Sequence, residues 1–267
     1  MTANRWMGSL FGRRLVAGTM AAILCFLTGP ALSAEGIDPD ADDVLKSMST
    51  YLANLSSFSM STDIDNEILD LEGQKLQLSS TASVAIQHPG NLYIHRKGAY
   101  ADVEIRFDGE TLTVYSKSKG FYWQAKSPGN IDQAIRAMEI ETGLDMPGAD
   151  LLLENPYASL IEGATSGAYL GTAYVHGIEC HYLSFRADKV DWQLWVQTGE
   201  TPLPMKYVIT TKWVTAAPQY SIRFRDWNTQ AALPADQFMF TAPDGAQEIE
   251  SLPGVNEIGE FVEGAQQ

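Results

Sequence analysis

A pair of strand-like runs separated by a short turn is the feature that most constrains the fold. The first run is Trp192–Val196 and the second is Met205–Thr210, with a turn containing Gly and Pro between them. Aromatic and β-branched residues of this kind suit a pleated, half-buried surface rather than a catalytic loop. The pair therefore predicts a curved sheet with apolar side chains on its concave side.

Further stretches carry a period of two, in which alternate side chains point to one face of a strand. Apolar residues alternate from Phe58 to Ile64 and again from Leu76 to Ile86, and Asp108-Gly109 between two strand-like runs indicates a hairpin. The pattern predicts a long antiparallel meander with one buried face. Strands are expected at 58–64, 76–86, 92–96, 103–107, 111–115, 121–124, 167–175, 178–186, 190–197, 205–212 and 219–227.

Two regions show helical spacing instead. Apolar residues from Val44 to Leu55 recur at helical intervals behind Pro39 and a run of acids, which predicts an amphipathic helix over 39–55. Residues 130–155 combine spaced apolar side chains with a break at Met146-Pro147-Gly148, and predict two short helices. Strands on both sides of this insertion predict an α+β fold, with one antiparallel sheet covered on one side by helices.

The first 34 residues have the pattern of a secretory signal peptide. Three arginines precede an apolar run from Leu15 to Leu27, and small residues lead up to a predicted cleavage after Ala34. A retained membrane anchor is the alternative, but the run is short for a bilayer span, which needs roughly 20 residues. The signal predicts export to the periplasm with no stable membrane span. Cys180 is then the remaining thiol, so no internal disulfide is expected.

Charge limits the classes of partner. Removing the signal takes away three arginines and no acids, so the net charge of −15 becomes −18. Such an acidic chain is poorly suited to nucleic acid or to anionic membrane surfaces, which attract basic patches. From Asp244 onward there are six acids and no Lys or Arg. The expected organisation is a signal over 1–34, a single domain over 35–245 and an acidic, flexible tail over 246–267.

Candidate chemical sites are weak. The run His176–His181 contains two imidazoles, a carboxylate and the thiol of Cys180, but the spacing matches no standard metal site, and a turn at Gly177 is the simpler interpretation. A nucleophilic Cys180 would need an oriented base, and the adjacent His181 would point to the other face of a strand. We therefore predict a protein with no metal, no cofactor and no catalytic residues.

Two sets of charged residues are open to a functional interpretation. Pairs such as Glu139 and Glu141 suit acid/base hydrolysis, but pairs arise by chance in a chain with 33 acids, and a solvated face is favoured. Arg223 and Arg225 share one strand face, where they would form surface ion pairs or hold an anionic head group at a cavity mouth. Surface ion pairing is the favoured interpretation.

Several runs together resemble a known bacterial family. They are Ile105–Tyr115, Asn130-Ile131-Asp132, Val175–Leu183, Trp192–Val196 and Leu203-Pro204. Over roughly residues 38–245 the chain resembles the family called domain of unknown function 2092 (DUF2092). That family is similar in architecture to the lipoprotein carriers of the LolA/LolB type. The resemblance implies a periplasmic protein whose antiparallel sheet curves into an incomplete β-barrel wrapped around short helices, with a hydrophobic cavity between them.

The side chains that would line such a cavity are apolar and come from both sheet and helices. Large apolar pockets with few polar groups are typical of small-molecule sites, although the same side chains would equally fill a core. Trp192 and Trp195 cannot both point inward, because residues three apart on a strand lie on opposite faces. The candidate lining residues are Phe58, Met60, Leu78, Trp123, Met138, Leu144, Leu151, Leu152, Trp192 and Trp195.

These patterns together predict an exported, non-enzymatic protein that binds an apolar ligand, such as a lipid or a lipoprotein acyl chain. An interaction module of the cell envelope, with a filled barrel and a protein partner, is the alternative. A cavity distinguishes the two interpretations, because only the first needs one.

Overall fold

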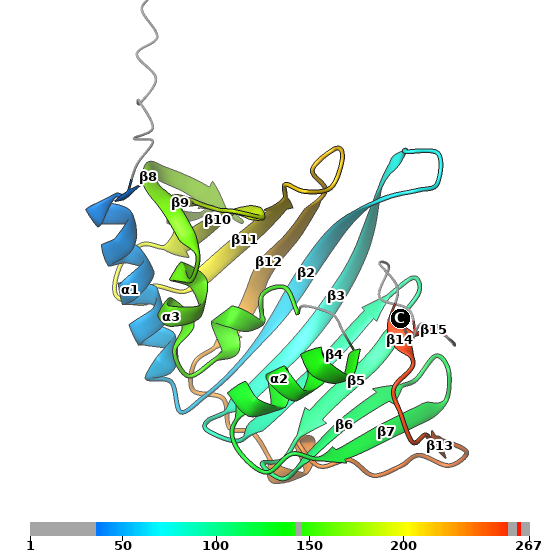
Figure 1. Ribbon diagram of the computed structural model, residues 1–267. Helices are drawn as coiled ribbons and strands as arrows, with labels where there is room; N and C mark the ends of the chain where they lie inside the picture. Colours follow the sequence, from blue (N-terminus) through cyan, green and yellow to red (C-terminus); the bar gives the residue numbers. More distant parts are fainter. Residues whose placement is uncertain (1–35, 143–145, 256–260, 263–267) are drawn as a thin grey trace, which may run out of the picture. The chain divides into compact units, whose positions relative to one another are not determined.

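The computed structural model describes residues 36–142, 146–255 and 261–262, which all belong to one structural unit spanning residues 33–267. Its main element is a 13-stranded sheet in the order β1-β8-β9-β10-β11-β12-β2-β3-β4-β5-β6-β7-β13 (Figure 1). The strands are β1 Gly36–Ile37, β2 Ser57–Leu69, β3 Lys75–Gln87, β4 Asn91–Gly98, β5 Asp102–Phe107, β6 Thr111–Ser116, β7 Phe121–Lys126, β8 Ala164–Val175, β9 Ile178–Ala187, β10 Val190–Gln197, β11 Pro204–Thr211, β12 Gln219–Asn228 and β13 Gln247–Glu248.

The sheet is curved and unclosed, and its strand pairs are antiparallel except at the two edges, where β1 pairs with β8 and β13 with β7 in parallel. Figure 1 shows the larger helices on one side of it. The helices are α1 Pro39–Ala53, α2 Ile131–Thr142, the 3-10 helix η1 Ala149–Leu152, α3 Pro156–Ile161 and the 3-10 helix η2 Ala235–Gln237. The predicted α+β fold, an antiparallel sheet curved into an incomplete barrel around short helices, is confirmed.

Helix α1 begins and packs as its sequence predicts. The Asp38 carboxylate accepts a hydrogen bond from the backbone N–H of Asp40 at 3.0 Å, and Pro39 occupies the first turn, where its missing N–H has no cost. The buried side of the helix carries Leu45, Met48 and Leu52. Burial of this apolar stripe against the sheet is what stabilises the helix.

The central hairpin of β2 and β3 shows how buried and partly exposed side chains alternate in the sheet. Phe58, Met60, Thr62 and Ile64 are all buried, and the residues between them are partly exposed. Each pairs with a residue of β3 that points to the same face, so Met60 lies opposite Val84. The face that holds these residues is called the concave face below, and the other the convex face.

The helical insertion differs from its prediction in detail. Two short helices were expected over 130–155, and the structure has α2 followed by the single 3-10 turn η1. Helix α3 comes after this region and was not predicted, because six residues are too few to show a helical period. Its start is nevertheless marked in the sequence, since the Asn155 side chain accepts a hydrogen bond from the N–H of Ala158 at 3.1 Å.

Two apolar residues are buried in the described part of the C-terminal tail, whereas its polar side chains are mostly exposed. Strand β13 continues the sheet beside β7, and Leu252 and Phe261 are buried. Phe261 packs edge-on against Phe121 with ring centroids 5.3 Å apart. The expected flexibility of this acidic tail stays a prediction. Two further short strands, β14 Gly254–Val255 and β15 Phe261–Val262, pair with each other. The predicted signal over 1–34 lies outside the described residues.

Candidate functional site

A cavity of about 240 Å³ lies between the concave face and the segment that contains α2 and η1. Its floor comes from strands β2 to β6 and β12, and its other walls come from α2, residues 146–152 and Phe261. Nearly all of the lining is apolar. The lining residues are Met60, Thr62, Ile64, Ala82, Val84, Ile94, Arg96, Ala101, Val103, Ile105, Val114, Met138, Thr142, Met146, Pro147, Gly148, Ala149, Leu152, Tyr220, Ile222, Phe224 and Phe261.

Strand register explains why this floor is apolar. Residues directly opposite each other on neighbouring strands point to the same face, so one row of side chains crosses the sheet. An apolar row runs through Met60, Val84, Ile94, Ile105 and Val114 on five consecutive strands. This row forms a continuous hydrophobic surface under the side chains of Met138 and Leu152.

Three of the ten sequence-predicted residues line the cavity, namely Met60, Met138 and Leu152. Phe58, Trp123 and Leu151 are buried in the core outside it, and Leu78 is half-buried towards the far end of the β2–β3 hairpin. Leu144 lies outside the described residues. Residue type alone does not separate a cavity wall from the packed core beside it.

The two tryptophans of β10 point in opposite directions, as their spacing requires. Trp192 is buried on the concave face and stacks on Phe185 with ring centroids 4.1 Å apart. Trp195 is on the convex face, where it stacks on Tyr182 at 4.4 Å and lies under the Lys206 ammonium. Neither tryptophan lines the cavity, because β11 lies between β10 and β12, the nearest strand of the cavity floor.

Two polar side chains interrupt the apolar floor. Arg96 lines the cavity and donates one hydrogen bond, from its Nε to the Ser80 hydroxyl at 3.2 Å. The Thr62 hydroxyl is buried in the same wall and has no hydrogen-bond partner among the described residues. Sequence reasoning missed Arg96, although a signal was present. In Leu92–Arg96 the arginine occupies the same phase as Leu92 and Ile94, so it had to share their face.

The arginines that were considered as head-group ligands lie elsewhere. Arg223 pairs with Asp65 at 2.8 Å and Arg225 with Asp63 at 3.1 Å, both on the convex face. The predicted surface ion pairing is therefore confirmed. Their placement away from the cavity rules out the alternative in which they hold a head group at its mouth.

The His176–His181 run forms the turn between β8 and β9 and the first residues of β9. His176 and Gly177 both have positive φ, of 50° and 78°, which places them in the tight turn between β8 and β9. The Cys180 thiol is buried, and burial raises its pKa, which disfavours the reactive thiolate. Within the described ranges, no cluster of three His, Cys, Asp or Glu side chains is arranged to hold a metal.

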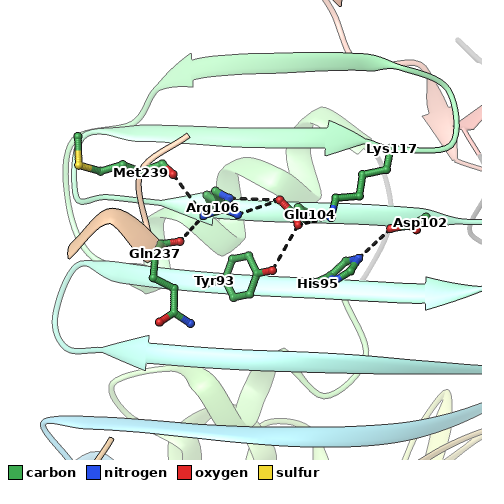
Figure 2. A network of polar contacts seen from close by, with 8 residues as sticks. All are labelled: Tyr93, His95, Asp102, Glu104, Arg106, Lys117, Gln237 and Met239. Atoms are coloured by element: carbon green, nitrogen blue, oxygen red, sulfur yellow. Dashed lines mark hydrogen bonds and ion pairs between the residues drawn. The ribbon is translucent and has the colours of Figure 1, made fainter. Parts of the chain in front are cut away.

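The convex face of the same strands carries a polar network (Figure 2). Glu104 is buried and pairs with Arg106 at 2.9 Å and with Lys117 at 2.6 Å. Burial opposes its ionisation, but the hydrogen bonds from Lys117 and Arg106 outweigh burial and lower the pKa of Glu104. Arg106 also donates to the backbone oxygens of Gln237 and Met239, at 2.5 and 3.2 Å. The network therefore holds the segment around Gln237 and Met239, which follows β12, against the sheet.

The comparison with protein families indicates the compartment. A family model described as "Predicted periplasmic protein (DUF2092)" matches residues 41–252. No curated protein sequence matches the chain. Among the described residues, no helix is long and apolar enough to cross a membrane.

Solved structures with a similar arrangement share little sequence with this chain. The Mycobacterium tuberculosis lipoprotein LppX matches with a TM-score of 0.45 and 12% identity, over 74% of this chain and 100% of its own. The Pseudomonas aeruginosa MucA/MucB complex matches with a TM-score of 0.42 and 17% identity, over 76% and 62%. A putative outer membrane lipoprotein-sorting protein domain from Vibrio parahaemolyticus matches with a TM-score of 0.35 and 8% identity, over 74% and 96%. These matches assign no role to any residue of this chain.

Proposed function

Because the chain belongs to the DUF2092 family of predicted periplasmic proteins, we propose that it is an exported, non-enzymatic protein that binds an apolar ligand. The ligand is a lipid or a lipoprotein acyl chain, and it lies in the cavity between the concave face and the α2–η1 segment. The signal-like pattern of residues 1–34 supports export, because it combines a basic start, an apolar run and a small-residue cleavage region.

The cavity is the observation that carries this proposal. Its floor is the continuous apolar row from Met60 to Val114, and an acyl chain on that row would lose its contact with water. Burial of acyl surface contributes roughly 0.8 kcal/mol for each CH₂, before the cost of ordering the chain. Flexible Met60 and Met138 on opposite walls adapt to chains of different shape.

The composition of the cavity wall supports a binding role over a catalytic one. General acid–base and nucleophilic mechanisms need a titratable group beside the reacting atoms, with a partner that tunes it. The lining contains one arginine, two threonines and a tyrosine, and no His, Cys, Asp or Glu among the described residues. Arginine stays protonated and does not act as a base.

Native mass spectrometry of protein purified without detergent from its own periplasm tests the proposal, followed by lipid extraction. We expect a stoichiometric additional mass that extracts as lipid. A fluorescent dye that brightens in apolar surroundings provides the second readout, and a fatty acid should displace it.

Two variants test whether the ligand lies in this cavity. Ala82→Phe fills the floor and is expected to weaken dye binding at least tenfold. Ser83→Phe is the matched control, because Ser83 is exposed on the opposite face of the same strand and should leave binding unchanged. Absence of both lipid and dye binding in the folded protein would contradict the proposal and favour the envelope interaction module.

A further inference from the structure

The floor of the cavity contains a cation, Arg96, that has no anionic partner among the described residues. Arg96 is half-buried, and in the described part of the chain no carboxylate lies within 4.0 Å of its guanidinium. Its single hydrogen bond, to the Ser80 hydroxyl, uses one of five N–H donors. A partly desolvated charge normally has an opposite charge beside it, because removal from water is costly.

Thr62 supplies a second and independent observation. The residue is only 4% exposed, it lines the cavity, and its hydroxyl has no hydrogen-bond partner in the described ranges. Buried side-chain hydroxyls in native proteins are almost always hydrogen-bonded. The Arg96 guanidinium only donates hydrogen bonds and the Thr62 hydroxyl can donate one, so a ligand acceptor would satisfy both groups.

Sheet register places the two donors on either side of a small residue. Thr62 lies opposite Ala82, and Ala82 lies opposite Arg96, on three adjacent strands. Two strand spacings separate the backbones of Thr62 and Arg96 by about 10 Å. The methyl group of Ala82 leaves the space between them open to the cavity, which Ala82 also lines.

A tyrosine extends this polar patch. Tyr220 lines the cavity, and burial raises the pKa of its phenol while the charge of Arg96 acts in the opposite direction. The phenol is therefore protonated at neutral pH and is available as a further hydrogen-bond donor. The apolar row of Met60, Val84 and Ile105 begins immediately beside the patch, one row further along the strands.

We propose that the cavity selects single-chain amphiphiles with an anionic oxygen head group, a carboxylate or a phosphate. The guanidinium of Arg96 and the hydroxyl of Thr62 bind the head group above Ala82, and the acyl chain runs over Met60, Val84 and Ile105. A hydrogen bond between an ionised donor and an ionised acceptor is about twice as strong as a neutral one, so charge decides which amphiphile binds. This inference rests on the proposed function and names the ligand class of the same cavity.

Titration calorimetry at neutral pH tests the head group with three ligands of equal chain length, namely decanoate, decyl phosphate and decanol. We expect wild type to bind at least one of the two anions at least tenfold more tightly than decanol, and the stronger of the two identifies the source of the head group. Arg96→Met should remove this preference and leave decanol binding unchanged. Arg223→Met is the matched control, because it removes a paired arginine from the convex face and should keep the preference.

The outcomes separate the two proposals. Equal binding of all three ligands by wild type, or an undiminished preference in Arg96→Met, overturns the inference and leaves the proposed function standing. Binding of none of them overturns both. Thr62→Val, which keeps the shape and removes the hydroxyl, tests the same point if Arg96→Met does not fold. It should weaken binding of the preferred anion several-fold and leave decanol binding unchanged.

Discussion

Strands β4 and β5 present two faces, and the charged side chains on those faces have opposite surroundings. On the convex face, Arg106 and Lys117 both pair with Glu104 (Figure 2). On the concave face, Arg96 lines an apolar cavity without an ion pair among the described residues. Breaking a buried network in which each charge is paired is costly, because it leaves a charge uncompensated, whereas an unpaired charge in an apolar wall has no ion pair to lose. The contrast separates residues that hold the sheet together from those available to a ligand.

Removing the buried carboxylate is the largest expected perturbation of the convex face. Glu104→Gln leaves Arg106 and Lys117 without their counter-charge, and breaking a buried pair in this way is strongly destabilising. Since the two cations are partly solvated, we expect the free energy of unfolding to fall by about 2–3 kcal/mol, as measured by urea denaturation. Dye binding in the cavity should persist.

Asp63→Asn provides the control for that variant. Asp63 pairs with Arg225 on the same face, but both side chains are largely solvated, at 46% and 40% exposure. Exposed pairs of this kind contribute about 0–1 kcal/mol. Equal losses in the two variants would mean that burial does not distinguish the Glu104 network.

A pair of alanines on β3 compares the packing of the two faces directly. Ala85 is buried on the convex face and Ala82 lies in the cavity floor. Ala85→Leu inserts three carbons into a packed site and should cost about 1–3 kcal/mol of stability. Ala82→Leu should change stability by less than about 1 kcal/mol, because the added atoms enter the cavity. Thermal and urea unfolding measure both, and a similar cost for both would argue that the cavity is filled.

Acid provides a graded test of the Glu104 network. The pKa of Glu104 is lowered below its ordinary value of 4.5, so its contribution to stability is present above that pH and is lost as the pH falls through the folded-state pKa. Other carboxylates also titrate there, so the useful quantity is the difference in unfolding free energy between wild type and Glu104→Gln. We expect this difference to shrink as the pH falls from neutral to strongly acidic conditions. A pH-independent difference would exclude the charge of Glu104 as its cause.

The sequence was sufficient for eleven of the thirteen strands of the sheet, β2 to β12, because each of these is encoded locally. Alternation from Phe58 to Ile64 identifies β2 and its buried face without any knowledge of its partners. The cavity depends instead on long-range pairing. Thr62 lies opposite Phe224 across the junction of β2 and β12, and no local pattern indicates that these two residues meet. Trp123 and Met60 look alike as cavity candidates for the same reason, although only Met60 lines the cavity.

Arg96 is an intermediate case. Its phase in β4 places it on the apolar face, and a charged residue in an apolar phase is detectable from sequence. The sequence does not indicate which side chains surround the Arg96 guanidinium. A carboxylate from another strand at that point would have made it a structural ion pair like Arg223 and Asp65. Only the three-dimensional arrangement distinguishes the two possibilities.

Arg96→Met has the smallest expected effect on stability, and it tests most directly whether charged residues on the two faces have different roles. Arg96→Met removes a charge that has no ion pair in the described part of the chain and replaces it with an apolar side chain in an apolar wall. The loss of one hydrogen bond to Ser80 opposes the gain from avoiding a desolvated charge, so we expect the free energy of unfolding to change by less than about 0.5 kcal/mol. Arg106→Met on the convex face is the comparison, and it should cost several times more because it strips Glu104 of a partner and frees two backbone oxygens. A large loss for Arg96→Met in urea denaturation would make Arg96 a structural residue. An almost unchanged free energy of unfolding, combined with loss of the preference for anionic amphiphiles, would show that Arg96 serves ligand binding and not the stability of the fold.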